Sequence, residues 1–123
     1  MAKAQVLIVE DERIVAAELR RRLLRLGYGV SGMAASGQEA IDKAHLLHPD
    51  LVLMDVGLTG LMTGIEAGEA IHARLQIPVV YLTGHAESAL PGELRFYVQK
   101  PLDEAALRAT LVRALAGRPS GTS

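Results

Sequence analysis

The sequence predicts a single α/β domain built on a doubly wound parallel sheet, and three observations support this fold class. Short continuous apolar runs recur along the 123 residues, as is typical of strands that are covered on both faces. Segments with helical periodicity lie between these runs, so that strands and helices alternate and right-handed crossovers are expected. Half of the residues are hydrophobic, which suffices for one core.

The N-terminal half contains two predicted strands, at residues 6–9 and 30–34, and two predicted helices. Four apolar residues mark the first helix: Val15, Leu19, Leu23 and Leu26. Gly27 stands where a left-handed cap would end that helix. Ser36 and Glu39 match a capping box at the start of the second helix. Three apolar residues then follow at helical spacing: Ile41, Ala44 and Leu47.

The C-terminal half contains predicted strands at residues 51–54, 79–82 and 96–98. A third helix is predicted before Pro78, and Asp103 precedes the last helix. Their apolar stripes are Ile65, Gly68, Ile71 and Leu75, and then Leu107, Leu111 and Leu115. We expect one domain over residues 1–116, followed by a polar tail or the start of a linker at 117–123.

One glycine motif could suggest a nucleotide site. The stretch from Gly27 to Gly32 matches G-x-G-x-x-G. The dinucleotide fingerprint requires a strand before this motif and a helix after it, whereas the order here is reversed. We therefore interpret the stretch as a helix cap and a turn.

Composition excludes several function classes. Thirteen basic and fourteen acidic residues give a net charge of −1, and only four residues are aromatic, so we expect neither direct nucleic-acid binding nor membrane binding. The chain has no cysteine, which excludes disulfides and thiolate metal sites. No long apolar run marks a signal peptide or a membrane span. We expect a cytoplasmic location.

Polar side chains stand where the predicted strands end. Glu10 and Asp11 follow the first strand, Asp55 follows the third, Thr83 the fourth, and Lys100 the fifth. In an open parallel sheet, ligands bind outside the carboxyl ends of the strands. If these strands are neighbours, the five side chains converge on one site.

The chemistry of this group is specific. Neighbouring carboxylates repel one another unless they are protonated or bind a hard cation. Because the group contains neither His nor Cys, Mg²⁺ is the expected metal, with Mn²⁺ as an alternative. A lysine suits a phosphate, a threonine hydroxyl can donate to a phosphoryl oxygen, and a carboxylate can attack phosphorus.

Four motifs in this order, VLIVEDE, LVLMDVGL, YLTGH and YVQKP, resemble the receiver domain of two-component response regulators over residues 4–116. The resemblance implies a flavodoxin-like strand order, 2-1-3-4-5. It implies that Asp55 accepts a phosphoryl group from a histidine kinase or a histidine phosphotransfer protein. The chain would then be a phosphorylation-driven switch in signal transduction. It would catalyse only its own phosphorylation and dephosphorylation, not the turnover of a diffusible substrate.

The resemblance also implies a metal site. Asp11 and Asp55 would bind Mg²⁺ directly, and Glu10 would bind it through water. The backbone carbonyl of Gly57 would complete the protein's share of the site.

Further roles follow from the same resemblance. Thr83 and Lys100 would contact the phosphoryl group. Thr83 and Tyr97 match the switch pair, in which the hydroxyl turns toward the phosphoryl group and the ring rotates inward. The peptide bond before Pro101 is commonly cis in this family.

The sequence departs from the family in two places. Only residues 84–99 separate Thr83 from Lys100, so we expect the helix that usually connects strands four and five to be shortened or irregular. His85 lies in this segment, and we hypothesise that it tunes the lifetime of the acyl phosphate. After Asp55 the loop lacks a proline that many receivers carry, and three glycines should make it flexible: Gly57, Gly60 and Gly64.

Other classes agree less well with the sequence. A pseudo-receiver, which binds a partner without phosphorylation, is the main alternative. A phosphotransferase with an aspartyl-phosphate intermediate would resemble D-x-D-x-T, but residues 55–59 read DVGLT. A flavodoxin would place a hydroxyl-rich phosphate loop after the first strand, where this chain has acids.

Overall fold

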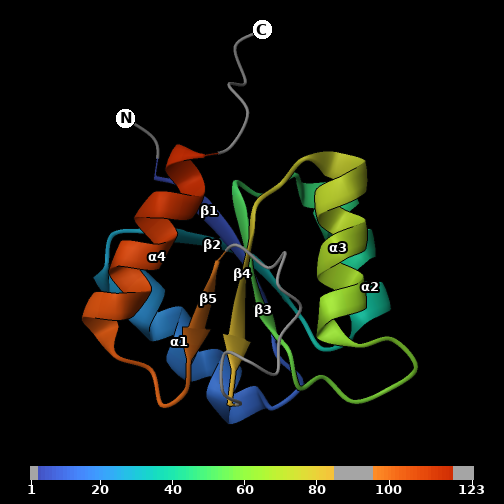
Figure 1. Cartoon of the computed structure of the whole chain (residues 1–123), viewed down its shortest axis with the longest axis horizontal. Coiled ribbons are helices and arrows are strands. Elements are labelled where there is room, and N and C mark those ends of the chain that lie inside the picture. The colour runs from blue at the N-terminus through green and yellow to red at the C-terminus, as the bar shows by residue number, and fades with distance from the viewer. Residues whose placement is uncertain (1–2, 85–95, 118–123) are drawn as a thin grey trace, which may run out of the picture.

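The computed structural model describes residues 3–84 and 96–117, which form a five-stranded sheet in the order β2-β1-β3-β4-β5 (Figure 1). All neighbouring strands are parallel. The strands are β1 Gln5–Val9, β2 Gly29–Ala34, β3 Leu51–Asp55, β4 Val79–Thr83 and β5 Tyr97–Gln99. The predicted fold class and strand order are confirmed, and every strand boundary agrees with the prediction to within one residue.

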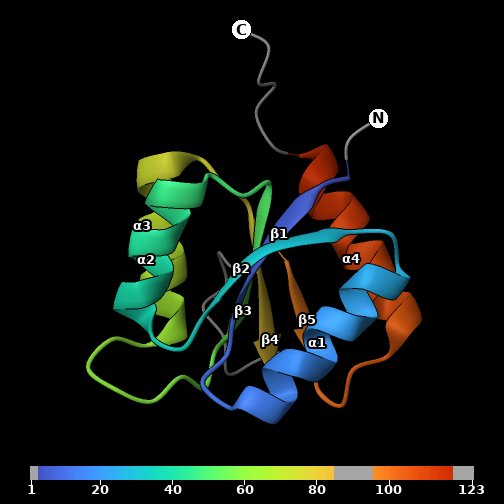
Figure 2. The same cartoon turned by 180° about the vertical axis from the view of Figure 1, so that it is seen from behind.

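Helices cover both faces of the sheet (Figures 1 and 2). They are α1 Arg13–Arg25, α2 Gly37–Leu47, α3 Gly64–Leu75 and α4 Glu104–Ala116. Alternate residues of each central strand point to opposite faces, so Ile8 packs in one core with Leu19 and Leu107, whereas Val9 packs in the other with Ala40 and Ile71. The helices α1 and α4 therefore share one face, and α2 and α3 share the other.

The helix ends test the predicted caps. Gly27, which follows the Leu26 C-cap of α1, has φ +97°, as predicted. The Ser36 side chain accepts a hydrogen bond from the Glu39 N–H at 3.1 Å, but the Glu39 carboxylate accepts from the N–H of Ala35 at 2.8 Å. The predicted capping box at α2 is therefore only half correct. Leu47, predicted on the apolar stripe of α2, has 40% of its surface exposed.

A complete capping box, which was not predicted, begins α3. The Glu66 N–H donates to the Thr63 hydroxyl, and the Thr63 N–H donates to the Glu66 carboxylate. The next residue, Gly64, is the first of the helix, and a Cβ atom there would lie 2.1 Å from the backbone oxygen of Asp55. The expectation that Gly64 belongs to a flexible loop is therefore wrong, because close packing of α3 against β3 requires a glycine here.

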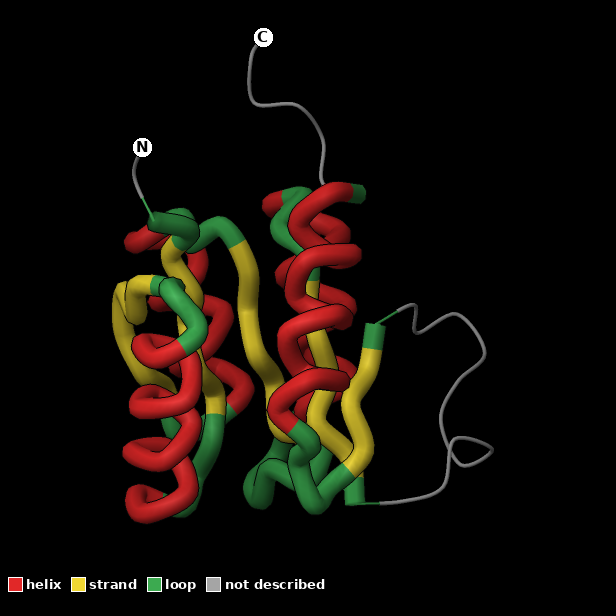
Figure 3. The backbone as a smooth tube through the Cα atoms, turned by 90° about the vertical axis from the view of Figure 1, so that its left-hand side faces the viewer, coloured by secondary structure: helices red, strands yellow, loops and turns green. Residues whose placement is uncertain are grey.

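All strands run in one direction, so their carboxyl ends and the loops that follow them gather at one end of the molecule (Figure 3). At the opposite end β1 begins and α4 ends (Figure 1). Residues 85–95 lie outside the described residues, and with them the predicted irregular connection and His85. Among the helices of the described residues, none is long and apolar enough to cross a membrane.

Candidate functional site at the carboxyl ends of the strands

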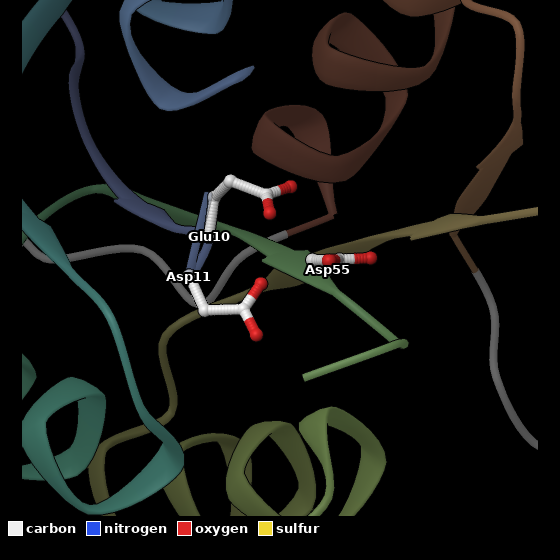
Figure 4. A group of neighbouring side chains, drawn as sticks. All are labelled: Glu10, Asp11 and Asp55. Carbon is white, nitrogen blue, oxygen red and sulfur yellow. The ribbon is translucent and has the colours of Figure 1, made fainter. Parts of the chain in front are cut away.

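The structure brings the three predicted carboxylates together. Glu10 and Asp11 directly follow β1, and Asp55 is the last residue of β3. Because β1 and β3 are paired in the sheet, one oxygen from each side chain lies within 4.8 Å of the others. Figure 4 shows the Glu10 and Asp11 carboxylates extending toward the side on which Asp55 lies.

Asp55 lies at the centre of the site and is only 6% exposed. Its Oδ1 accepts a hydrogen bond from the Lys100 ammonium at 3.2 Å and another from the Gly57 N–H at 3.1 Å. The backbone N–H of Lys100 donates to the carbonyl of Thr83 at 2.7 Å, which brings the lysine from β5 to the end of β4. The lysine therefore faces Asp55, as its predicted role requires.

Glu10 is a buried carboxylate with incomplete hydrogen bonding. Its Oε2 accepts from the Glu12 N–H at 3.1 Å, whereas Oε1 is buried and has no hydrogen-bond partner among the described residues. The Lys100 ammonium lies 4.0 Å from Oε1. Burial, aided by the negative charge of Asp55, raises the pKa of Glu10 to about 7, although the Glu12 N–H and Lys100 oppose the shift.

Asp11 has an unpredicted partner, Thr59, in the loop between β3 and α3. The Thr59 hydroxyl donates to Oδ2 of Asp11 at 2.9 Å, and the Thr59 N–H donates to the same oxygen at 3.3 Å. These bonds, the hydroxyl above all, hold the pKa of Asp11 below its usual value. The sequence shows a hydroxyl residue four positions after Asp55, but nothing in the pattern indicates how the loop folds back toward β1.

The donor set fits a hard divalent cation. All three side chains offer carboxylate oxygens, which Mg²⁺ prefers, and they leave room for water or phosphate oxygens among the ligands. The unpartnered Oε1 of Glu10 is a second sign, since a buried acceptor without a donor is costly. A cation held by Asp11 and Asp55 would supply positive charge beside this oxygen.

The two predicted switch residues lie at neighbouring strands. Thr83 ends β4 and is 1% exposed. Tyr97 begins β5, opposite Tyr81 of β4, and its half-buried side chain packs against the core on the α2 and α3 face. The peptide bond between Lys100 and Pro101 is cis, the isomer that the resemblance implies.

Comparison with known proteins agrees with this geometry. Residues 6–112 match the family described as the response regulator receiver domain. The chain belongs to this family. Receiver domains are regulatory modules of two-component systems rather than classical enzymes, and they generally bind Mg²⁺ at an acidic pocket.

Individual relatives share both sequence and fold with the chain. It is 31% identical over 115 residues to the phyllosphere-induced regulator PhyR of Methylorubrum extorquens, covering 90% of this chain and 43% of that protein. It is 40% identical over 86 residues to the transcriptional regulatory protein PdtaR of Mycobacterium tuberculosis, covering 70% and 42%. The receiver domain of Erythrobacter litoralis PhyR superposes with a TM-score of 0.86 at 33% identity, covering 100% of this chain and 98% of that one.

The chain spans less than half the length of these two curated relatives. Their similarity to this chain therefore concerns the receiver domain and does not extend to the rest of either protein.

Proposed function

We propose that this receiver domain accepts a phosphoryl group on Asp55 in a Mg²⁺-dependent reaction and changes conformation to signal to a protein partner. The donor would be the phosphohistidine of a histidine kinase or of a histidine phosphotransfer protein. The observation that supports this proposal best is the position of Asp55, a buried carboxylate paired with Lys100 and adjacent to two further carboxylates.

The contacts of Asp55 suit the role of nucleophile. Within the described part of the chain, both hydrogen bonds to this side chain end on Oδ1, so they fix the carboxylate and leave Oδ2 as the oxygen that attacks phosphorus. A P–O bond forms as the P–N bond of phosphohistidine breaks, and the imidazole nitrogen keeps the electron pair. Lys100 offsets charge on the transferred group, as preorganised cations do in phosphoryl transfer.

The metal would be held by Asp11 and Asp55, with Glu10 acting through water and Gly57 contributing its carbonyl oxygen. When bound, Mg²⁺ supplies the positive charge that lets the phosphoryl group approach three carboxylates. The chain's own part is to hold these carboxylates at one end of the sheet before the donor arrives.

Signalling would use Thr83 and Tyr97. A phosphoryl group on Asp55 offers an acceptor at the end of β3, and the Thr83 hydroxyl at the end of the adjacent β4 can donate to it. Tyr97 lies on the next strand and can occupy the space behind the hydroxyl. The phosphoryl group shifts this equilibrium only if it binds one arrangement more tightly, by a few kcal/mol.

Intact mass spectrometry tests the proposal. The wild type, Asp55→Asn and the control Asp42→Asn, which changes an acid on α2, are incubated with the phosphodonor phosphoramidate, with and without Mg²⁺. We expect one phosphoryl adduct on the wild type and on the control, only with Mg²⁺, and none on Asp55→Asn. An unmodified wild type, under conditions that phosphorylate another receiver domain, would overturn the proposal in favour of a pseudo-receiver.

A further inference from the structure

Thr59 makes a contact that joins two distant parts of the site. It lies in the loop between β3 and α3, and both its hydroxyl and its N–H donate to Oδ2 of Asp11, 48 residues earlier in the sequence. Two donors on one oxygen restrict both the rotation and the position of the carboxylate. The contact therefore fixes the orientation of the Asp11 carboxylate relative to those of Glu10 and Asp55.

The loop holds Thr59 in place from both sides. The preceding residue, Leu58, is buried and packs in the core beneath α2 and α3. On the other side, Thr63 closes its capping box, and Gly64 packs against the backbone of Asp55. The packed and hydrogen-bonded residues on both sides of Thr59 thus help to hold its donors near Asp11.

We propose that Thr59 is a positioning residue for the cation, acting through its hydrogen bonds to Asp11. This inference rests on the proposed function, because it assumes that Asp11 is a metal ligand. Carboxylates that bind metals are usually held by outer hydrogen bonds, and loss of such a bond typically lowers metal affinity about 10- to 100-fold. By the reciprocity of linked equilibria, metal binding in turn stabilises the loop around Thr59.

The test measures Mg²⁺ binding to the unphosphorylated full chain by calorimetry. Thr59→Val keeps the shape of the side chain and the backbone N–H but removes the hydroxyl donor, whereas Thr59→Ser keeps the donor. We expect Thr59→Val to bind Mg²⁺ about 10-fold more weakly, and Thr59→Ser to bind within about twofold of the wild type because its donor remains. Mn²⁺ binding, followed by electron paramagnetic resonance, should show the same ranking.

A matched control removes a threonine hydroxyl elsewhere. The hydroxyl of Thr110 donates to the Ala106 carbonyl within α4, so Thr110→Val should leave Mg²⁺ affinity unchanged. Circular dichroism confirms that each variant is folded.

Two results would overturn the inference: wild-type affinity in Thr59→Val, or equal losses in Thr59→Val and Thr59→Ser, which would indicate packing rather than hydrogen bonding. If the wild type itself binds no Mg²⁺, the proposed function fails first, so the two failures are distinguishable.

Discussion

Glu10 is a residue whose ionisation opposes folding. Its pKa rises from 4.5 to about 7 in the folded chain, chiefly because the side chain is buried. Between these values the folded state holds a proton that the unfolded state has released. The contribution of Glu10 to the free energy of unfolding is therefore largest below about pH 4.5, decreases as the pH rises to about 7, and stays low above that.

This sign gives a prediction for Glu10→Gln in the absence of divalent cations. The variant removes the charge, so at pH 8 it should be more stable than the wild type by about 3 kcal/mol, since one pKa unit corresponds to about 1.4 kcal/mol and the pKa of Glu10 rises from 4.5 to about 7. At pH 5 the difference should be much smaller. Urea unfolding followed by circular dichroism at both pH values measures it.

The control for this experiment is Glu69→Gln, which changes an exposed acid on α3 and should show no such pH dependence. A stability difference between Glu10→Gln and the wild type that is the same at pH 5 and pH 8 would contradict the assignment.

Sequence patterns identify residues at strand ends better than residues in loops. Glu10, Asp11 and Asp55 could be placed because a buried strand ends where apolar residues give way to acids, and parallel strands end at one edge of the sheet. Thr59 could not be placed, because its partner depends on the path of the loop. The unpartnered oxygen of Glu10 also depends on packing around β1 that no local pattern specifies.

Among the elements, α3 packs so closely against β3 that its first residue, Gly64, leaves no room for a side chain. A Cβ atom at Gly64 would lie 2.1 Å from the Asp55 backbone oxygen, a separation that only backbone movement can relieve. We therefore expect Gly64→Ala to lower the free energy of unfolding by about 1 to 3 kcal/mol or more. Because the displaced backbone belongs to Asp55, phosphorylation should slow as well.

Gly84→Ala is the matched control, since a Cβ atom there meets none of the described residues within 4 Å and the backbone φ is not in the left-handed region. Urea unfolding of both variants makes the comparison. Equal stability of Gly64→Ala and the wild type would show that α3 can move away from β3 at little cost.

Capping patterns show what the sequence predicts about elements. Asp103, which was expected only to precede the last helix, is the N-cap of α4, and its carboxylate accepts from the Ala106 N–H at 2.9 Å. The S/T-x-x-E pattern occurs before both α2 and α3, yet only Thr63 and Glu66 complete it. The pattern predicts that a helix starts there. It does not predict which backbone N–H the glutamate carboxylate accepts from, because that depends on the conformation of the turn before the helix.

At the scale of the whole molecule, cation binding should stabilise the fold. A ligand that binds only the folded state adds about 2.7 kcal/mol when its concentration is 100 times its Kd. We expect Mg²⁺ to raise the thermal midpoint of the wild type at pH 8 but not that of Asp11→Asn. At pH 5 the effect should be smaller, because protons compete with the metal at the site.

Thermal unfolding followed by circular dichroism measures this shift, and NaCl at matched ionic strength is the control for general salt effects. An equal shift with Mg²⁺ and NaCl, or an undiminished shift in Asp11→Asn, would contradict specific binding at the acidic site.

The alternation of strands and helices was enough to predict the layered α/β architecture, because each buried strand must be covered on both faces. This alternation was not enough to predict the order of the strands in the sheet. The order 2-1-3-4-5 came from the resemblance to receiver domains, and the structure confirms it. Pairing between strands that are distant along the chain depends on how the crossovers pack, which short-range patterns do not encode.

The strands separate the two ends of the molecule by a fixed distance. β1 begins and α4 ends at the end of the molecule opposite the acidic site (Figure 1), and a five-residue strand is about 16 Å long. Any module joined to either end would thus be attached at the end of the molecule opposite Asp55. For the same reason, an affinity tag or a sensor-chip anchor attached at either terminus would leave the acidic site accessible to an incoming kinase.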